Sequence, residues 1–267
     1  MKIQGSSGNI NFKYAKGKTD IYGRLFHDYY EIFLMTNGSV EFTNSHTKRI
    51  LSPFQIVLIP PGEYHQFTVT ENKENYERFV IDIYPGLTNQ GILTHAFDGK
   101  EILTLTKSDR IVEHFFYLKD CLENGNREDF PYILDSIATD MVFLIKNIDN
   151  AAETSVENFS KLSLIVIDYI DKHFTEDIDL GMLSRKFFCS VSTLCHIFKK
   201  EFGISIKKYI IQKRLNAAKM ALQQGAKAEE VCMHYGFLNY SSFYRHYKNH
   251  FGISPSETNC QNLNPNP

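Results

Sequence analysis

The sequence predicts an α+β protein, with an N-terminal β-barrel flanked by two helices and a C-terminal all-helical domain. Short apolar segments rich in β-branched and aromatic residues recur between turn signals through residues 1–85, a pattern typical of a small barrel or sandwich. From Ser108 onward, apolar residues recur at helical spacing. Near the end of the chain, residues 192–205 are repeated in similar form as residues 241–254, which indicates one helical unit used twice.

Apolar runs bounded by turns define the strands of the predicted barrel. Asn37-Gly38, Ser52-Pro53 and Pro60-Pro61-Gly62 separate several of these runs, because Gly, Pro and Asn favour the backbone conformations that turns need. The expected strands are Ile10–Tyr14, Glu31–Met35, Val40–Thr43, Gln55–Ile59, Gln66–Thr70 and Arg78–Tyr84. We expect the N-terminal arm, Met1–Asn9, to close over the barrel, whose interior can hold one small ligand.

Residues 86–148 are predicted to form a turn-rich connection over residues 86–107 and then two helices. Ser108 is a candidate cap for the first helix, and the second helix runs from Ile133 to Ile148, after Pro131. The two apolar stripes consist of Ile111, Phe115, Leu118 and Leu122, and of Ile133, Ile137, Met141, Leu144 and Ile148. Such stripes pack on the barrel or on a second copy of the protein, so the pair is also a candidate dimerisation surface.

Residues 149–160 are polar and small, and we expect them to link the barrel to a C-terminal domain over residues 161–267. The helices expected there are Leu162–Phe174, Asp179–Phe187, Ser190–Gly203, Ser205–Gln224, Ala228–Tyr235 and Asn239–Phe251, the last of which we expect to be the final helix. In each half, a short helix, a tight turn and a second helix opened by a polar cap follow one another. This order predicts two helix-turn-helix units.

Charge is divided unevenly along the 267 residues, whose net charge is only −2. Between Lys161 and Gly252 there are 14 Lys and Arg against 8 Asp and Glu, a net charge of +6, whereas the rest has 15 against 23, a net charge of −8. A basic module joined to an acidic one indicates that one part of the chain binds a polyanion.

Cysteine usage and hydropathy limit the possible classes of protein. The five cysteines are scattered without a CxxC pair or a His/Cys cluster, so we expect reduced thiols and no structural zinc. The sequence has no run of eighteen apolar residues and nothing like a signal peptide at its start. We therefore expect a cytoplasmic protein with no membrane partner.

The repeated unit has the chemistry of a reader of double-stranded DNA. In a helix-turn-helix the first turns of the second helix face base edges in the major groove. The predicted base contacts are Ser192, Thr193, Cys195 and His196 in the first unit and Tyr240, Ser241, Tyr244 and Arg245 in the second. The predicted phosphate contacts are Lys199, Lys200, Lys248 and Asn249. Arg245 has the clearest role, because a guanidinium can bond guanine O6 and N7 together.

The opposite face of each reader helix is predicted to be core. Leu194 and Phe198 in the first helix, and Phe243 and Tyr247 in the second, are spaced by four residues. The helix between the two units has about 20 residues and is about 30 Å long. This length can hold the two readers close to one DNA turn apart, about 34 Å.

The C-terminal segment, residues 160–257, resembles the DNA-binding domain of AraC/XylS-type transcriptional regulators. The resemblance spans Leu180–Ser184, Ser192–Lys199, Gly203–Ser205, Arg214–Lys219, Val231–Phe237, Phe243–Lys248 and Phe251–Glu257. It implies a sequence-specific regulator that binds promoter DNA as a homodimer, contacts RNA polymerase if it is an activator, and senses a small-molecule effector in its barrel. A repressor whose barrel only dimerises is a further alternative.

Two segments of the barrel resemble the cupin motifs. Leu25–Glu31 followed by Gly38 resembles the first, with Leu25 in place of its first histidine, and Pro60–His65 resembles the second. The residues left at ligand positions, His27, Glu31 and His65, suit a two-histidine, one-carboxylate iron(II) site. The rival function is therefore a metal-dependent cupin enzyme.

The resemblance to AraC-type regulators favours a sensor without a metal or other cofactor and without catalytic residues. In that interpretation His27, Tyr29, Glu31 and His65 are polar groups of the effector pocket.

Overall fold

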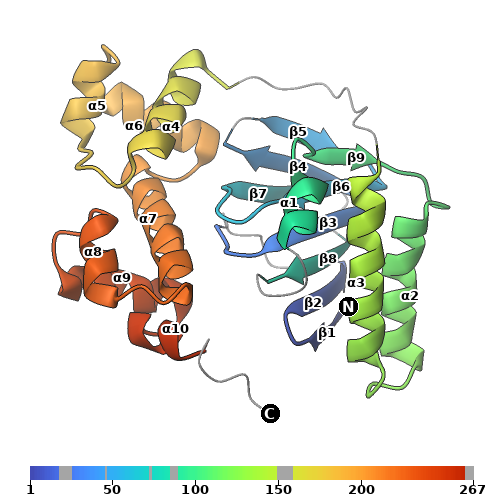
Figure 1. Ribbon diagram of the computed structural model, residues 1–267. Helices are drawn as coiled ribbons and strands as arrows, with labels where there is room; N and C mark the ends of the chain where they lie inside the picture. Colours follow the sequence, from blue (N-terminus) through green and yellow to red (C-terminus); the bar gives the residue numbers. More distant parts are fainter. Residues whose placement is uncertain (18–25, 46, 72–73, 85–89, 149–158, 262–267) are drawn as a thin grey trace. The chain divides into compact units, whose positions relative to one another are not determined.

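The computed structural model describes residues 1–17, 26–45, 47–71, 74–84, 90–148 and 159–261. The chain divides into two compact units, Met1–Glu157 and Asn158–Pro267. The first contains all the described strands and three helices, and the second has only helices, joined by turns, among its described residues (Figure 1). This confirms the predicted α+β class.

The strands of the first unit form two antiparallel sheets. Their bounds are β1 (Lys2–Ser7), β2 (Ile10–Lys16), β3 (Tyr30–Asn37), β4 (Ser39–Asn44), β5 (Lys48–Leu51), β6 (Gln55–Ile59), β7 (His65–Glu71), β8 (Glu77–Ile83) and β9 (Ile102–Thr104). One sheet has the order β1-β2-β8-β3-β6-β9, and the other has the order β5-β4-β7. The strand-containing part thus extends beyond residue 85, because β9 pairs with β6.

The six-stranded sheet is buried on both faces. Alternate side chains along each strand point to opposite faces and therefore belong to two different cores. In β3, Ile32 and Leu34 belong to the core beneath the helices, whereas Phe33 and Met35 belong to the core between the two sheets. Because side chains alternate with period two, Glu31 faces the same interior as Phe33. The interior itself is well filled, since the rings of Phe33 and Phe67 stack with centroids 3.9 Å apart.

Three helices cover the outer face of this sheet (Figure 1). They are α1 (Gln90–Phe97), α2 (Arg110–Asn124) and α3 (Phe130–Lys146). The predicted stripes are correct at their centres, where Phe115 and Met141 are fully buried in the core against the sheet. The predicted cap was wrong, because Asp109 occupies that position and receives a hydrogen bond from the Thr106 backbone N–H at 2.5 Å.

The expectation of an arm over the barrel was also wrong, since Lys2–Ser7 pairs antiparallel with Ile10–Ala15 as an edge strand. Only one side chain of this edge strand is buried. Its sequence therefore lacks the apolar alternation by which strands are recognised. Elements β9 and α1 were missed for a related reason: they are short and acquire their order from partners distant in sequence. Strand β5 pairs with the neighbouring β4 but has only four residues, too few to show a clear alternation.

The second unit contains α4 (Lys161–His173), α5 (Leu180–Lys186), α6 (Val191–Phe202), α7 (Ile206–Gln223), α8 (Ala228–His234), α9 (Tyr240–Phe251) and α10 (Pro255–Gln261). Five N-cap side chains accept a backbone N–H, namely Ser160, Asp179, Ser190, Ser205 and Asn239. Helices α6 and α9 end at Gly203 and Gly252, which have left-handed backbone conformations. These boundaries confirm both helix-turn-helix units.

Helix α10 corrects the expectation that α9 is the last helix. Ser254 and Glu257 form a reciprocal capping box, in which the Ser254 backbone N–H donates to the Glu257 carboxylate and the Glu257 N–H donates to the Ser254 hydroxyl. The Tyr247 hydroxyl lies 2.8 Å from Thr258 Oγ1 and joins α9 to α10.

Candidate nucleic-acid interface and ligand-binding sites

The two predicted reader helices, α6 and α9, present their polar faces to solvent. The exposed predicted base contacts are Ser192, Thr193, His196, Tyr240, Ser241, Tyr244 and Arg245, while Cys195 is half-buried. The predicted phosphate contacts Lys199, Lys200, Lys248 and Asn249 are exposed as well. All twelve side chains therefore lie on two helices whose N-terminal turns are held by polar caps.

The opposite faces of the same helices form the core of the unit. Leu194 and Phe198 are each 1% exposed, and Phe243 and Tyr247 are each 0% exposed, as the spacing predicts. The Phe198 ring lies 5.8 Å from that of Tyr209 on α7. Each reader is thus anchored by apolar contacts that leave its polar face outside.

Three of the predicted contacts also interact within the protein. The Ser190 hydroxyl that caps α6 lies 2.8 Å from the hydroxyl of Thr193 and also receives the Thr193 backbone N–H. In α9, the Lys248 ammonium lies 5.9 Å from the centre of the Tyr244 ring. Thr193 therefore contributes to the helix start, and Lys248 is drawn over Tyr244.

A single guanidinium connects the two helix-turn-helix units. Arg214 on α7 donates to the backbone carbonyls of Phe174, Glu176 and Gly236, each at 2.6 Å. Gly236 has φ +74°, and a Cβ there would lie 2.7 Å from the Thr175 carbonyl oxygen. Glycine at this position allows the close approach through which Arg214 ties the turn before α9 to the segment after α4.

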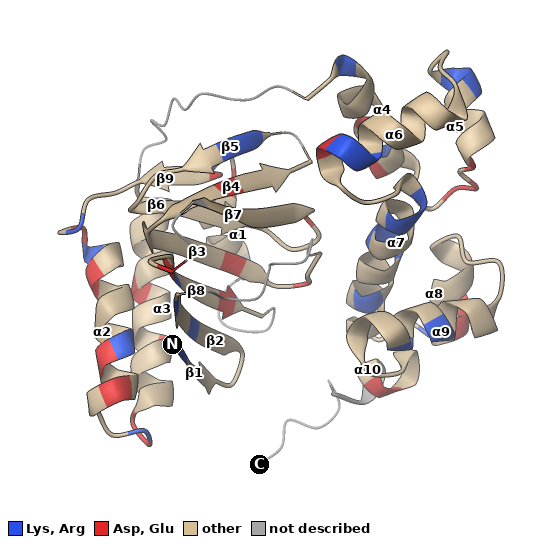
Figure 2. Ribbon diagram, turned by 180° about the vertical axis from the view of Figure 1, so that it is seen from behind, with Lys and Arg blue, Asp and Glu red and all other residues tan. Residues whose placement is uncertain are grey.

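Basic residues gather on the helices of the second unit. Figure 2 shows Lys and Arg along α6 and α7, and Lys207 and Lys208 at the start of α7 are exposed. With Lys199 and Lys200 in the last turn of α6, they form a basic surface within the segment of net charge +6. This distribution is the electrostatic footprint of a polyanion-binding domain.

In the first unit, the structure brings together all four predicted effector contacts, three of them as a cluster of possible ligands. His27, Glu31 and His65 are 5%, 5% and 0% exposed. His27 Nε2 lies 3.7 Å from Glu31 Oε2, and His65 Nε2 lies 3.8 Å from Glu31 Oε1. Tyr29 stacks on His27 with ring centroids 4.0 Å apart. Leu25, the cupin-motif position where a histidine is replaced, lies outside the described residues.

Burial determines the protonation of this cluster in the absence of a cation. It raises the pKa of Glu31 to about 8, with a further increase from the neighbouring Asp82. It lowers the pKa of His27 to about 4 and, together with repulsion from His27, the pKa of His65 to about 3. At neutral pH the two imidazoles are therefore uncharged.

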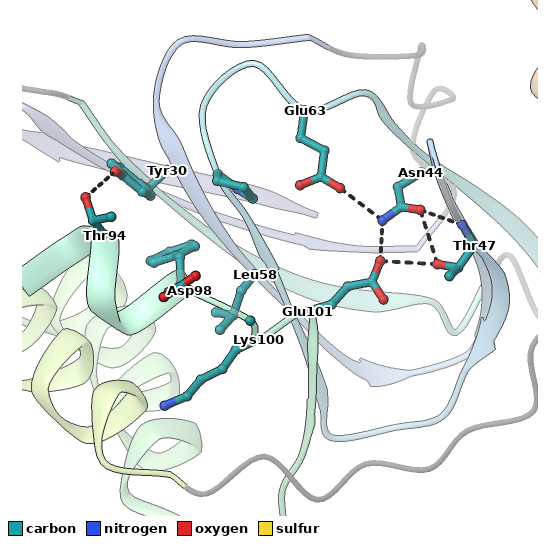
Figure 3. Close-up of a pocket in the computed structure, with 12 residues that line it drawn as sticks. Tyr30, Asn44, Thr47, Leu58, Glu63, Thr94, Asp98, Lys100 and Glu101 are labelled. Carbon is teal, nitrogen blue, oxygen red and sulfur yellow. Dashed lines mark hydrogen bonds between the residues drawn. The ribbon is translucent and has the colours of Figure 1, made fainter. Parts of the chain in front are cut away.

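An open pocket of about 480 Å³ lies elsewhere in the first unit, beside α1 and β9 (Figure 3). Its lining is Tyr30, Asn44, Thr47, Leu58, Pro60, Glu63, Thr94, Phe97, Asp98, Gly99, Lys100 and Glu101. The Asn44 amide donates to the carboxylates of both Glu63 and Glu101. The predicted effector contacts are not among these lining residues, and no motif in the sequence pointed to this pocket.

Comparison with known proteins matches both units. Residues 8–133 match the AraC-like ligand binding domain, and residues 183–260 match a helix-turn-helix domain. An uncharacterized HTH-type transcriptional regulator, YdiP of Escherichia coli (strain K12), is 32% identical over 241 residues, which cover 85% of this chain and 77% of that relative. The chain belongs to the AraC family of transcriptional regulators.

Two further proteins are similar over comparable lengths. The probable transcriptional regulator LumQ of Photobacterium leiognathi is 25% identical, covering 86% of this chain and 89% of that relative. A solved structure, ToxT of Vibrio cholerae O395, aligns over 93% of this chain and 96% of that chain at 14% identity, with a TM-score of 0.39. The family assignment confirms the predicted regulator, with a ligand-binding N-terminal domain and a DNA-binding C-terminal domain.

This AraC-family regulator also exposes large apolar side chains in the two turns that precede its reader helices. Phe188 is 96% exposed and has φ 51°, and Leu238 is 95% exposed. Sequence reasoning missed both, because an apolar residue beside a turn ordinarily indicates packing. Phe188 lies three residues before the start of α6, and Leu238 lies two residues before the start of α9. Both are candidates for apolar contact with DNA, for example with thymine methyl groups.

Cys121, Cys189, Cys195 and Cys232 are free cysteines among the described residues. None of the helices in that part of the chain combines the length and apolarity needed to cross a membrane.

Proposed function

We propose that this AraC-family regulator reads promoter DNA with the N-terminal turns of α6 and α9. The supporting observation is that both helices bury one apolar face and present the eight predicted base contacts at the other, seven of them exposed. Arg245 is the principal specificity contact of this proposal, worth about 1–3 kcal/mol against a wrong base. Lys199, Lys200, Lys248 and Asn249 position the helices on phosphates.

The effector of the regulator, in this proposal, enters the open pocket of Figure 3. A volume of about 480 Å³ suits one small molecule. Carboxylates of Glu63, Asp98 and Glu101 line the pocket, whereas the ammonium of Lys100 donates to the Ile145 and Lys146 carbonyls at 2.6 and 2.7 Å. An acceptor-rich lining favours an effector that carries several hydroxyl or amino hydrogen-bond donors.

The homodimer and the contact with RNA polymerase are further parts of the proposal. Tyr117 on α2 and Tyr132 and Phe143 on α3 are 52%, 75% and 43% exposed, although the apolar stripes of both helices pack on the sheet. These aromatic side chains favour the outer surface of the helical pair as the dimer contact. We assign the chain no catalytic role, because its surface and its relatives both point to regulation.

Mobility-shift and footprinting assays of the full chain on promoter DNA, including the region beside its own gene, test this function. We expect a specific complex that unlabelled specific DNA removes and unrelated DNA does not. Arg245→Ala should weaken the specific complex about 10-fold or more and relax the preference at one base position. Arg127→Ala, an exposed arginine of the first unit, is the matched control.

Two outcomes would contradict the proposal. Absence of any sequence-dependent complex would remove the DNA-reading function. Equal weakening of Arg245→Ala on specific and unrelated DNA would mean that Arg245 contacts phosphate rather than a base edge.

A further inference from the structure

The buried cluster of His27, Glu31 and His65 contains imidazole nitrogens that make no hydrogen bond and could act as metal ligands. Each histidine donates its Nδ1–H to a backbone carbonyl. His27 Nδ1 lies 2.8 Å from the Tyr29 carbonyl oxygen, and His65 Nδ1 lies 3.4 Å from the Glu63 carbonyl oxygen. Both Nε2 atoms are buried without a hydrogen-bond partner. An unpartnered buried polar atom costs stability, and here two of them converge on one carboxylate.

The orientation of the two rings is the one that metal ligation requires. A metal-ligating histidine typically donates one ring N–H to a backbone carbonyl, which fixes the tautomer and leaves the other nitrogen to the metal. His27 and His65 both satisfy this arrangement, since their Nε2 atoms face the two oxygens of Glu31. The cluster thus has the outer contacts of a metal site as well as the ligand types.

The spacing of the donor atoms is close to that of a metal centre. Bonds of about 2.1 Å at a tetrahedral angle place donor atoms about 3.4 Å apart. The two imidazole-to-carboxylate distances are 3.7 and 3.8 Å, and one ligand atom from each residue lies within 4.8 Å of the others. Side-chain adjustments of up to about 1.4 Å in the most widely spaced pair would close the three donors around one ion.

The surroundings also favour a cation. Asp82 lies opposite Glu31 in the β3–β8 register, its side chain is 0% exposed, and its Oδ1 has no hydrogen-bond partner. Lys13, whose side chain is 45% exposed, pairs with the other oxygen of Asp82. Glu31 and Asp82 therefore bring two buried carboxyl groups together beside the two imidazoles, and such oxygen and nitrogen atoms are ligands for a divalent transition metal.

We propose that His27, Glu31 and His65 bind one divalent transition-metal ion inside the two-sheet barrel, through both Nε2 atoms and the Glu31 carboxylate. Two imidazoles with one carboxylate suit Zn²⁺, Fe²⁺, Co²⁺ or Mn²⁺ better than the oxygen-preferring Mg²⁺ or Ca²⁺. Glu31 lies on β3 and His65 on β7, which belong to different sheets. The ion therefore clamps the two sheets together, whether or not α6 and α9 contact DNA as proposed.

The test uses the full chain purified without chelator, then stripped with EDTA and titrated with Co²⁺ and, separately, Zn²⁺. We expect one equivalent of either metal, visible Co²⁺ absorption bands, and an increase in melting temperature of about 5 °C or more at 100 times the dissociation constant. Glu31→Gln and His65→Ala should each lose at least 10-fold in affinity. His95→Ala, an exposed histidine on α1, should behave as the parent chain does.

The outcomes separate clearly. No uptake by the parent chain, or uptake that Glu31→Gln and His65→Ala both retain, would overturn the proposal. If His65→Ala fails to fold, the near-isosteric Glu31→Gln carries the comparison, with circular dichroism as the check on folding. X-ray absorption of the Zn²⁺-loaded parent chain provides an independent reading, because scattering from two imidazoles supports the site and a sulfur shell refutes it.

Discussion

Replacing Arg214 should destabilise the DNA-binding unit more than replacing any exposed basic residue. Its guanidinium donates three hydrogen bonds of 2.6 Å to backbone carbonyls, and the bonds to Phe174 and Gly236 are partly buried. A hydrogen bond from a charged donor contributes about 1.5–3 kcal/mol. Water can replace the exposed bond to Glu176, so Arg214→Ala should lower the free energy of unfolding by about 2–4 kcal/mol.

The assay is thermal unfolding of the full chain, followed on the transition that shifts when specific DNA is added. For a helical unit of this size, a loss of about 2–4 kcal/mol corresponds to a fall in melting temperature of about 10–20 °C. The melting temperature of Arg214→Lys should lie between those of the parent chain and Arg214→Ala, because one ammonium cannot bond three carbonyls in the directions of a planar guanidinium. Arg185→Ala, at an exposed position on α5, should change the free energy by less than about 0.5 kcal/mol.

The reasoning would be refuted if Arg214→Ala and Arg185→Ala were equally stable. A second readout checks the positional role of Arg214. Because it ties the segment after α4 to the turn before α9, Arg214→Ala should weaken specific DNA binding even at temperatures where the unit is folded. Unchanged specific affinity would mean that the readers keep their spacing without this contact.

Two further predictions concern α6 and α9. Lys248→Ala should lower the slope of log affinity against log salt concentration by about one, because one phosphate contact is lost; an unchanged slope in a filter-binding salt series would place Lys248 away from the backbone. Ser190→Ala removes the α6 cap, which accepts the Thr193 N–H at 3.0 Å, and should lower the free energy of unfolding by about 1 kcal/mol. Ser190→Asp keeps a hydrogen-bond acceptor and should retain the stability of the parent chain. If urea titrations show that both variants lose the same free energy of unfolding, the capping role is excluded.

The helical unit was predictable because its boundaries are set by neighbouring residues. Ser190, Ser205 and Asn239 each cap the helix that begins one position later, and Gly203 and Gly252 end the readers in the left-handed conformation that glycine accepts. Local sequence therefore carries nearly all the information about these helices. The capping box at Ser254 and Glu257 carried the same kind of signal for α10 and was overlooked.

The short strands of the first unit depended on pairing with other strands rather than on their own sequence pattern. The edge strand β1 and the three-residue β9 exist because Ile10–Ala15 and Gln55–Val57 offer them backbone partners, and their own sequences show little alternation. The pocket of Figure 3 likewise draws residues from β3, β4, β6, α1 and the segment before β9. No pattern in one stretch of sequence predicts such a convergence.

The sequence by itself determined the class of the protein, its two reader helices and the residue types of the His27, Glu31 and His65 cluster. Spacing and capping are local properties, so they can be read from the chain alone. Only the tertiary structure decided that both Nε2 atoms stay unpartnered beside Glu31 and that Asp82 lies opposite it. Strand register and burial set those facts, because side chains from separate strands become neighbours only when the sheets close around them.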